Sequence, residues 1–197
     1  LLDINEDKTQ SLLRILSASR QSLVTFRSSV LMNSDTDVEP ASFQYVWSDI
    51  LLNSKENYAV QGYRESGKGQ IVLRSFPLHC VMFPEKSRDY IVIIKNNDQQ
   101  ATAKLDEIAL EVLTNPTIFT RVVGVKQNSA NVLSLDLRQT VAEDEERIIN
   151  LRIEAYGKGA SIRGLSNLDR RPKVIIIDDP QDIEDSRSDT VLERDWE

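Results

Sequence analysis

The apolar positions of this chain follow three patterns, and each pattern predicts a different kind of element. Apolar residues recur at near-helical spacing over residues 9–32, which predicts one or two amphipathic helices. Continuous apolar runs at 90–94 and 174–177 are typical of parallel strands that are covered on both faces. Residues 132–138 and 149–156 alternate between apolar and polar side chains, which predicts an antiparallel or edge pair of strands with one solvated face.

Further helical segments lie between these runs. We expect a helix over 42–52 that begins with Ser42 as its N-cap. A mostly buried helix is expected over 70–82, with Pro77 bending it or lying near a turn. A third helix, over 99–113, ends where Asn and Pro follow it.

The order of these elements predicts the fold class and the division of the chain. A short apolar run at 58–60 predicts one more strand, directly before residue 62. Alternating strands and helices call for an α/β fold with a mostly parallel central sheet flanked by helices. The polar run at 33–40 separates an N-terminal helical segment with its linker, residues 1–40, from a core domain, residues 41–197.

Composition narrows the class of protein. The chain has 197 residues, of which 40% are hydrophobic and 28% charged, and this suits one globular domain with a substantial core. The net charge of −7 gives no overall electrostatic footprint for a polyanion. Cys80 is the single cysteine, which excludes an internal disulfide and a cysteine-based zinc site. His79 is the single histidine, and we expect it to be a partly buried helix residue.

The ends of the sequence and its apolar runs set further expectations. No apolar run is long enough to span a bilayer, and no signal peptide is visible. The chain begins without Met and ends inside a helix-like pattern, so we expect it to be a fragment of a longer protein.

The strongest chemical signal lies between residues 62 and 70. The segment reads Gly-Tyr-Arg-Glu-Ser-Gly-Lys-Gly-Gln and contains the G-x-x-x-x-G-K core of a phosphate-binding loop. In such a loop, backbone N–H groups and the following helix N-terminus surround a phosphate, and Lys68 reaches the β- and γ-phosphates. Gly69 stands where the pattern has Ser or Thr, whose hydroxyl would bind Mg²⁺. A chance turn is the alternative interpretation of so degraded a pattern.

A second signal follows the apolar run at 174–177. Asp178 and Asp179 come directly after it, and the carboxyl end of a buried strand is where open α/β sheets bind ligands. The doublet therefore predicts a site for Mg²⁺ and water. Solvated aspartates that end an ordinary strand are the alternative, and the upstream loop makes that alternative less attractive.

Three other stretches carry weaker signals. Gln44 and its aromatic neighbours lie where an adenine-reading element is expected, although packing alone explains Phe43 and Trp47. The glycine-rich stretch 157–165 carries two cations and is either a mobile loop near bound phosphate or an ordinary surface loop. Asp182, with the acidic residues that follow it, is expected to begin a solvated helix.

Taken together, these motifs resemble the N-terminal ATPase part of the large terminase subunit of tailed bacteriophages, the motor that packages DNA into proheads. The resemblance covers most of the chain and depends on the order and spacing of its parts. These parts are the helices that contain Phe26 and Trp47, residues 63–68, residues 93–97, the Ile162-Arg163-Gly164 sequence, and residues 176–180.

The resemblance implies a P-loop NTPase of the additional-strand type, with ATP and Mg²⁺ as cofactors. Lys68 would hold the β- and γ-phosphates, Asp178 would hold Mg²⁺, and Asp179 would orient or deprotonate the attacking water. In these motors a Glu is commoner at the position of Asp179, so Asp182 is an alternative that would share its role. The nucleotide-binding residues would be Gln44, Gly62, Tyr63, Arg64, Glu65, Ser66, Gly67, Lys68, Gly69 and Gln70.

Two arginines complete the implied catalytic set. Arg64 matches an arginine proposed to sense the γ-phosphate from within the loop, and Arg163 matches one proposed to reach a neighbouring subunit's nucleotide. Without a hydroxyl at Gly69, water, Ser66 or Gln70 would have to complete the Mg²⁺ shell. We therefore expect weak ATP hydrolysis by the isolated chain.

The resemblance also implies partners and a location. The partners would be double-stranded DNA, the terminase small subunit, the portal protein and further copies in a homo-oligomeric ring, with a monomer as the alternative for the isolated chain. The location would be the cytoplasm of an infected bacterium, with no membrane association and with nuclease activity only in a further C-terminal part. The alternative functions are a nucleotide-binding scaffold with weak catalysis and a helicase-like DNA translocase.

Overall fold

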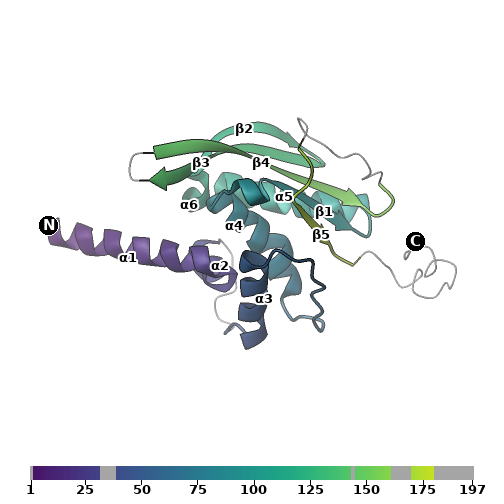
Figure 1. The fold of residues 1–197 in the computed structure, drawn as a ribbon, viewed down its shortest axis with the longest axis horizontal. Helices are drawn as coiled ribbons and strands as arrows, with labels where there is room; N and C mark the ends of the chain where they lie inside the picture. The colour runs from purple at the N-terminus through teal and green to yellow at the C-terminus, as the bar shows by residue number, and fades with distance from the viewer. Residues whose placement is uncertain (1, 32–38, 143–144, 161–169, 180–197) are drawn as a thin grey trace.

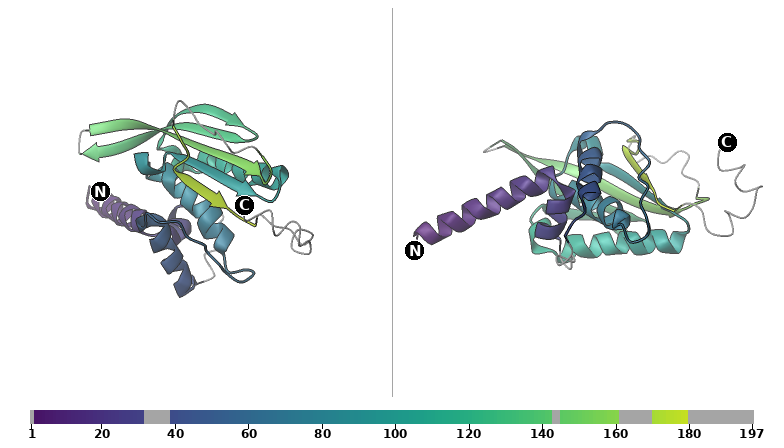
Figure 2. Two further views of the ribbon diagram at one scale, coloured as in Figure 1. Left: turned by 45° about the vertical axis from the view of Figure 1, so that its right-hand side comes forward. Right: turned by 90° about the horizontal axis from the view of Figure 1, so that it is seen from below.

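A computed structural model describes residues 2–31, 39–142, 145–160 and 170–179, and shows one five-stranded sheet with its helices gathered on one face (Figures 1 and 2). The helices are α1 (Leu2–Gln21), α2 (Leu23–Val30), α3 (Ser42–Asn53), the π-helical η1 (Gln70–Ser75), α4 (Phe76–Met82), the 3₁₀ turn η2 (Lys86–Arg88), α5 (Asp98–Thr114) and α6 (Pro116–Phe119). The strands are β1 (Tyr90–Lys95), β2 (Val122–Ser129), β3 (Val132–Ala142), β4 (Glu145–Gly157) and β5 (Val174–Ile177).

The sheet is mixed, with strand order β2-β3-β4-β1-β5. β1 pairs in parallel with β4 and with β5, whereas β2, β3 and β4 pair antiparallel. The predicted α/β class and the predicted antiparallel pair, β3 with β4, are confirmed. The expectation of a mostly parallel sheet is too simple, because β2 was not predicted and adds a second antiparallel pairing.

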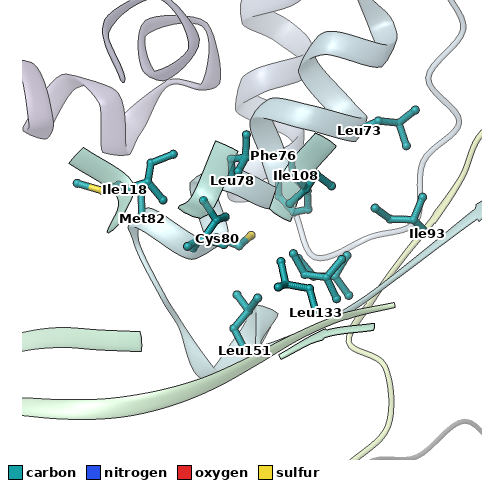
Figure 3. Close-up of a cluster of buried hydrophobic side chains, with 14 of the residues drawn as sticks. Leu73, Phe76, Leu78, Cys80, Met82, Ile93, Ile108, Ile118, Leu133 and Leu151 are labelled. Atoms are coloured by element: carbon teal, nitrogen blue, oxygen red, sulfur yellow. The ribbon is translucent and has the colours of Figure 1, made fainter. Parts of the chain in front are cut away.

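One hydrophobic core joins the sheet to the helices below it. Figure 3 shows side chains of α4, such as Phe76 and Leu78, facing Leu133 of β3 and Leu151 of β4. The same cluster includes Leu23 and Phe26 of α2. The prediction of one or two helices before residue 32 is confirmed as two, and the second of them, α2, packs into the core. The division at residue 40 stays a prediction.

β5 differs from the expected strand because only one of its faces is covered in the described part of the chain. Ile176 points into the core and is 7% exposed. Its neighbours Ile175 and Ile177 are 56% and 60% exposed. The prediction that this run would be covered on both faces is wrong. A continuous apolar run reports high β propensity, and here β5 lies at the edge of the sheet.

Two predictions about the region before the loop are also wrong. Residues 58–60 form no strand, and Tyr58 is exposed. Ala41, rather than Ser42, is the N-cap of α3, and no side chain caps it. Three apolar residues are too few to specify a strand without a partner that supplies ladder hydrogen bonds.

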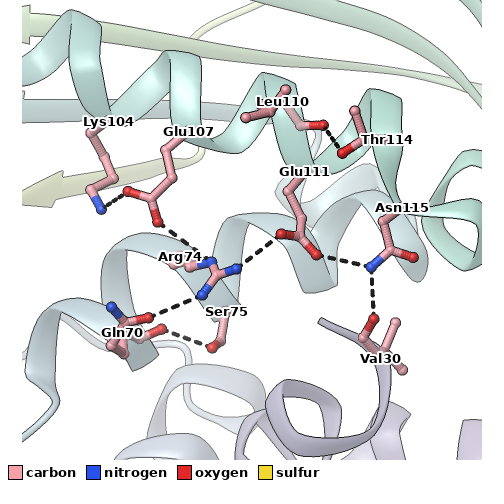
Figure 4. Close-up of polar contacts among 10 residues, drawn as sticks. All are labelled: Val30, Gln70, Arg74, Ser75, Lys104, Glu107, Leu110, Glu111, Thr114 and Asn115. Atoms are coloured by element: carbon pink, nitrogen blue, oxygen red, sulfur yellow. Dashed lines mark hydrogen bonds and ion pairs between the residues drawn. The ribbon is translucent and has the colours of Figure 1, made fainter. Parts of the chain in front are cut away.

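The helix that follows the loop starts as η1 and continues directly into α4, which has Pro77 in its first turn. Because the helix is continuous through Ser75, Pro77 removes one intrahelical N–H donor, and it does so directly after the π-helical turn. A buried polar network fixes this helix to its neighbours, and Figure 4 shows its chain of contacts. Arg74 Nη2 donates to Glu111 Oε2 at 2.9 Å, and Asn115 Nδ2 donates to Glu111 Oε1 at 2.9 Å and to the Val30 carbonyl at 2.7 Å.

His79 lies in α4, as predicted, but it is fully buried rather than partly buried. Its Nε2 lies 3.0 Å from the carbonyl oxygen of Arg20 at the end of α1. Burial lowers the pKa of His79 to about 4, so at neutral pH the ring is uncharged and Nε2–H donates to that carbonyl. The single histidine thus fixes α1 to the core.

Candidate nucleotide-binding site

The two motifs that are more than a hundred positions apart in the sequence meet at one edge of the sheet. Lys68 Nζ lies 3.5 Å from Asp178 Oδ1 and 3.8 Å from Asp179 Oδ1. Among the described residues, Lys68 has no other ion-pair partner. The structure therefore brings together the lysine and the aspartate doublet that the sequence singles out.

The parallel pairing of β1 with β5 puts the doublet at this edge. Asp178 N donates to the Ile94 carbonyl at 2.9 Å, so the ladder between the two strands extends into the doublet. The Asp178 side chain is only 12% exposed. Asp179 follows with φ of +45°, a left-handed conformation that turns its side chain out to 79% exposure. The two aspartates thus have different environments, one mostly buried and one solvated.

Lys95 is a member of this site that the sequence did not reveal. It ends β1, beside Asp178 on the paired strand, and Lys95 Nζ lies 2.7 Å from Asp178 Oδ2. Its side chain is 15% exposed. The Asp178 carboxylate therefore has one ammonium at each oxygen, Lys95 at hydrogen-bond distance and Lys68 farther away.

The loop before η1 has the backbone conformation that its glycine content suggests. Glu65 and Gly67 both have positive φ, +66° and +78°. A Cβ on Gly67 would also lie 2.7 Å from Gln44 Nε2, so this position needs glycine for two reasons. The chain turns at Ser66, whose N–H donates to the Tyr63 carbonyl at 3.1 Å, and the first helical hydrogen bond runs from Ile71 N to the Gly67 carbonyl.

Gln44, in the first turn of α3, supports this loop through a hydrogen bond to its backbone. It is buried, and its Nε2 donates to the Ser66 carbonyl at 2.9 Å. Its Oε1 is buried without a hydrogen-bond partner in the described part of the chain. The donor is thus committed to the loop backbone, and an acceptor is left for another group. Adenine reading by Gln44 stays a prediction.

An aromatic cluster lies beside the loop. Phe43 packs against Trp47, with ring centroids 4.8 Å apart, and against Tyr63 at 5.9 Å. These rings line a cavity of about 530 Å³ together with Gln61, Gly62 and Ser66. Tyr63 is largely exposed, so it offers a flat apolar surface next to the loop.

The donor set fits Mg²⁺ only when phosphate oxygens complete the shell. Gly69 offers no hydroxyl, and the Gln70 amide oxygen accepts from Arg74 Nη1 at 3.5 Å. Ser66 is buried with its Oγ against Gly62, where an added Cβ would lie 2.5 Å from it. Among the described residues no group of three or more His, Cys, Asp or Glu side chains gathers as a metal site. Mg²⁺ commonly uses one or two carboxylates plus substrate phosphates, which suits Asp178 with a bound triphosphate.

The remaining predicted residues are placed less closely or not at all. Arg64 lies exposed within the loop. Arg163 and Asp182 lie outside the described residues. The start of the glycine-rich stretch does come near the site, because Lys158 N donates to the Lys95 carbonyl at 2.7 Å.

None of the described helices combines the length and the apolar character needed to cross a membrane. No family model, curated protein or solved structure matches the chain. Its function is therefore inferred from its own residues and their geometry.

Proposed function

We propose that this chain binds ATP with Mg²⁺ between the 62–70 loop and the Asp178–Asp179 doublet, and that it hydrolyses the nucleotide. The observation that carries the proposal is the position of Lys68, whose ammonium lies 3.5 Å from Asp178 and 3.8 Å from Asp179. A lysine at the end of a glycine-containing loop, facing the carboxylates of a neighbouring segment, is an arrangement suited to binding a triphosphate and its metal.

Each residue then has a defined task. Lys68 contacts the β- and γ-phosphates, and the loop N–H groups surround them. Asp178 would hold Mg²⁺, which would supply positive charge to the phosphates. The exposed Asp179 orients a water whose oxygen bonds to the γ-phosphorus as the bond to the β–γ bridging oxygen breaks, and the carboxylate accepts the water's proton. ADP and phosphate leave.

The adenine base of ATP would lie next to the loop, near Gln44 and Tyr63. The buried Oε1 of Gln44 lacks a hydrogen-bond partner among the described residues and is an acceptor suited to the exocyclic amino group of adenine. The exposed ring of Tyr63 supplies a stacking surface. Both features support ATP as the nucleotide.

The wider role that we propose is the motor domain of a phage terminase large subunit, which moves double-stranded DNA into the prohead. This part of the proposal is supported by the order of the sequence motifs, which resembles that family from the helix with Phe26 to the doublet. In that role Arg163 would act on the nucleotide of a neighbouring copy in a ring. The terminase small subunit and the portal protein would be the other partners.

A thermal-unfolding experiment tests nucleotide binding. With a non-hydrolysable ATP analogue at about a hundred times Kd in excess MgCl₂, the melting temperature should rise by roughly 5–10 °C. Lys68→Ala should abolish the rise. Lys126→Ala, which removes an exposed lysine on β2 at the opposite edge of the sheet, is the matched control and should keep it. An equal rise in Lys68→Ala would contradict the proposed site.

A catalytically weak nucleotide-binding scaffold is the second candidate, and Gly69 favours it. The missing hydroxyl removes a metal ligand, yet nothing lies within 4 Å of a Cβ placed on Gly69. Gly69→Ser is therefore sterically permitted. A gain of ATP turnover in this variant would support an impaired site, and a loss would support a site that is tuned to glycine.

A further inference from the structure

The ion pair between Lys95 and Asp178 occupies the place that a divalent cation would take. The two side chains are 15% and 12% exposed, and Lys95 Nζ lies 2.7 Å from Asp178 Oδ2. A direct or water-mediated Mg²⁺ contact to this carboxylate must share it with, or displace, that ammonium. Since the second oxygen faces Lys68 at 3.5 Å, the whole carboxylate is already neutralised by cations of the chain.

Two independent features therefore weaken the hold on a metal ion. The first is Gly69, which lacks the hydroxyl ligand. The second is Lys95, whose positive charge repels a divalent cation at short range in a mostly buried site, where charges are poorly screened. Both features leave the phosphate oxygens, rather than the protein, as the main ligands of the metal.

The same lysine favours a triphosphate that carries no metal. Lys68 and Lys95 together supply two positive charges beside one buried carboxylate, and Asp179 is largely solvated. The mostly buried Lys95 and Asp178 cancel one another, and Lys68 adds a positive charge that only the solvated Asp179 offsets, so Lys68 can attract phosphate oxygens directly.

We propose that Lys95 substitutes for part of the divalent cation's charge, so that the site binds a nucleoside triphosphate with little dependence on Mg²⁺. This inference rests on the proposed nucleotide site and adds Lys95 to it as a positioning residue. Lys95 holds Asp178 in place and determines how strongly the binding of the triphosphate depends on Mg²⁺.

The test is the affinity of a fluorescent ATP analogue, measured in excess MgCl₂ and again in excess EDTA. For the wild-type chain the two values should differ by less than about threefold. In Lys95→Met, which keeps the length of the side chain but not its charge, affinity in EDTA should fall at least about tenfold below that in MgCl₂. Lys95→Arg should behave as the wild type.

Lys173→Met is the matched control. Lys173 pairs with Asp89 at 2.9 Å between the same two strands, but at their other end. This variant should keep the weak Mg²⁺ dependence. If Lys95→Met does not fold, Lys95→Gln gives the uncharged comparison with a hydrogen-bonding group retained.

The outcomes separate the inference from the function on which it rests. A wild-type chain that loses tenfold or more of its affinity in EDTA would overturn the role of Lys95 and leave the nucleotide site intact. An equal Mg²⁺ dependence in the wild type and Lys95→Met would do the same. No binding by the wild type in either condition would overturn both proposals.

Discussion

The two ends of the β1–β5 strand pair carry nearly the same ionic cluster. At the carboxyl edge, Asp178 faces Lys95 at 2.7 Å and Lys68 at 3.5 Å. At the amino edge, Asp89 faces Lys173 at 2.9 Å and Arg170 at 3.5 Å. Each mostly buried carboxylate thus has one close lysine and one more distant cation.

The difference lies in what else holds the more distant cation. Arg170 also donates to both oxygens of Asn150, to the carbonyl at 2.9 Å and to Oδ1 at 2.6 Å. Lys68 has no partner among the described residues except the two aspartates, whose oxygens lie 3.5 Å and 3.8 Å from its ammonium. Arg170 is therefore fixed by the fold, whereas Lys68 keeps donors for a ligand.

The two clusters thus differ in their more distant cation, which is an arginine with further partners at one end and a loosely held lysine at the proposed binding end. A cation such as Arg170, which makes several contacts with the fold, stabilises the chain. A cation held loosely beside a glycine-containing loop can bind an anion without breaking strong contacts. Substitutions at the two ends of the β1–β5 strand pair can test this difference separately.

The largest effect on stability is expected from Gly157→Ala at the carboxyl edge. A Cβ on Gly157 would lie 2.4 Å from the backbone nitrogen of Asp98, so β4 or the start of α5 must move. We expect a loss of about 3 kcal/mol in the free energy of unfolding, measured by urea denaturation. Gly124→Ala, where nothing lies within 4 Å of the new Cβ, is the control and should leave stability nearly unchanged. Equal losses in both variants would show that packing at Gly157 is not the cause.

Asp89→Asn should have the next largest effect, at the amino edge. It leaves Lys173 and Arg170 without their carboxylate and should cost about 2 kcal/mol of stability in the same assay. Nucleotide affinity should not change, because β1 has six residues and therefore separates the two edges by about 20 Å, well beyond the Debye length. If the nucleotide affinity of Asp89→Asn changed by more than about threefold, the two ends of the strand pair would not act independently.

Lys173→Met should have the smallest effect. The side chain of Lys173 is 37% exposed, and Arg170 remains beside Asp89 after the substitution. Because Lys173 is partly solvated and Arg170 still offsets the buried carboxylate, the substitution should cost only about 0.5–1 kcal/mol, measured by thermal and urea unfolding. A loss comparable to that of Asp89→Asn would show that the lysine, rather than the carboxylate, organises this edge.

Much of this architecture could be predicted from the pattern of apolar residues. The continuous apolar runs that became β1 and β5, the alternation in β3 and β4, and the helical periodicity of α2 and α5 are all strong patterns. The structure of the short run at 58–60 and the N-cap of α3 depend on tertiary partners. For both segments the prediction from the sequence was wrong. The exposure of one face of β5 could not be predicted from the sequence either, since an apolar run does not reveal whether a strand lies at the edge of a sheet.

The candidate site was predictable in part for the same reason. Lys68 and the doublet belong to short motifs with a known mechanism, so their meeting could be expected from order alone. Lys95 has no motif. Its position beside Asp178 follows from the register of β1 with β5, in which Ile94 pairs with Ile177, and a single sequence does not give that register. Gln44 was singled out for adenine reading, which stays a prediction, and its hydrogen bond to the loop backbone was not foreseen.

The most direct measurement of the central claim is a titration of a fluorescent ATP analogue into the wild-type chain, Lys68→Ala and Lys173→Ala. If Lys68 is the loosely held cation that binds the triphosphate, the wild type and Lys173→Ala should saturate with equal affinity, and Lys68→Ala should bind at least about thirtyfold more weakly. Equal affinity in Lys68→Ala and Lys173→Ala, or a wild type that never saturates, would contradict the account.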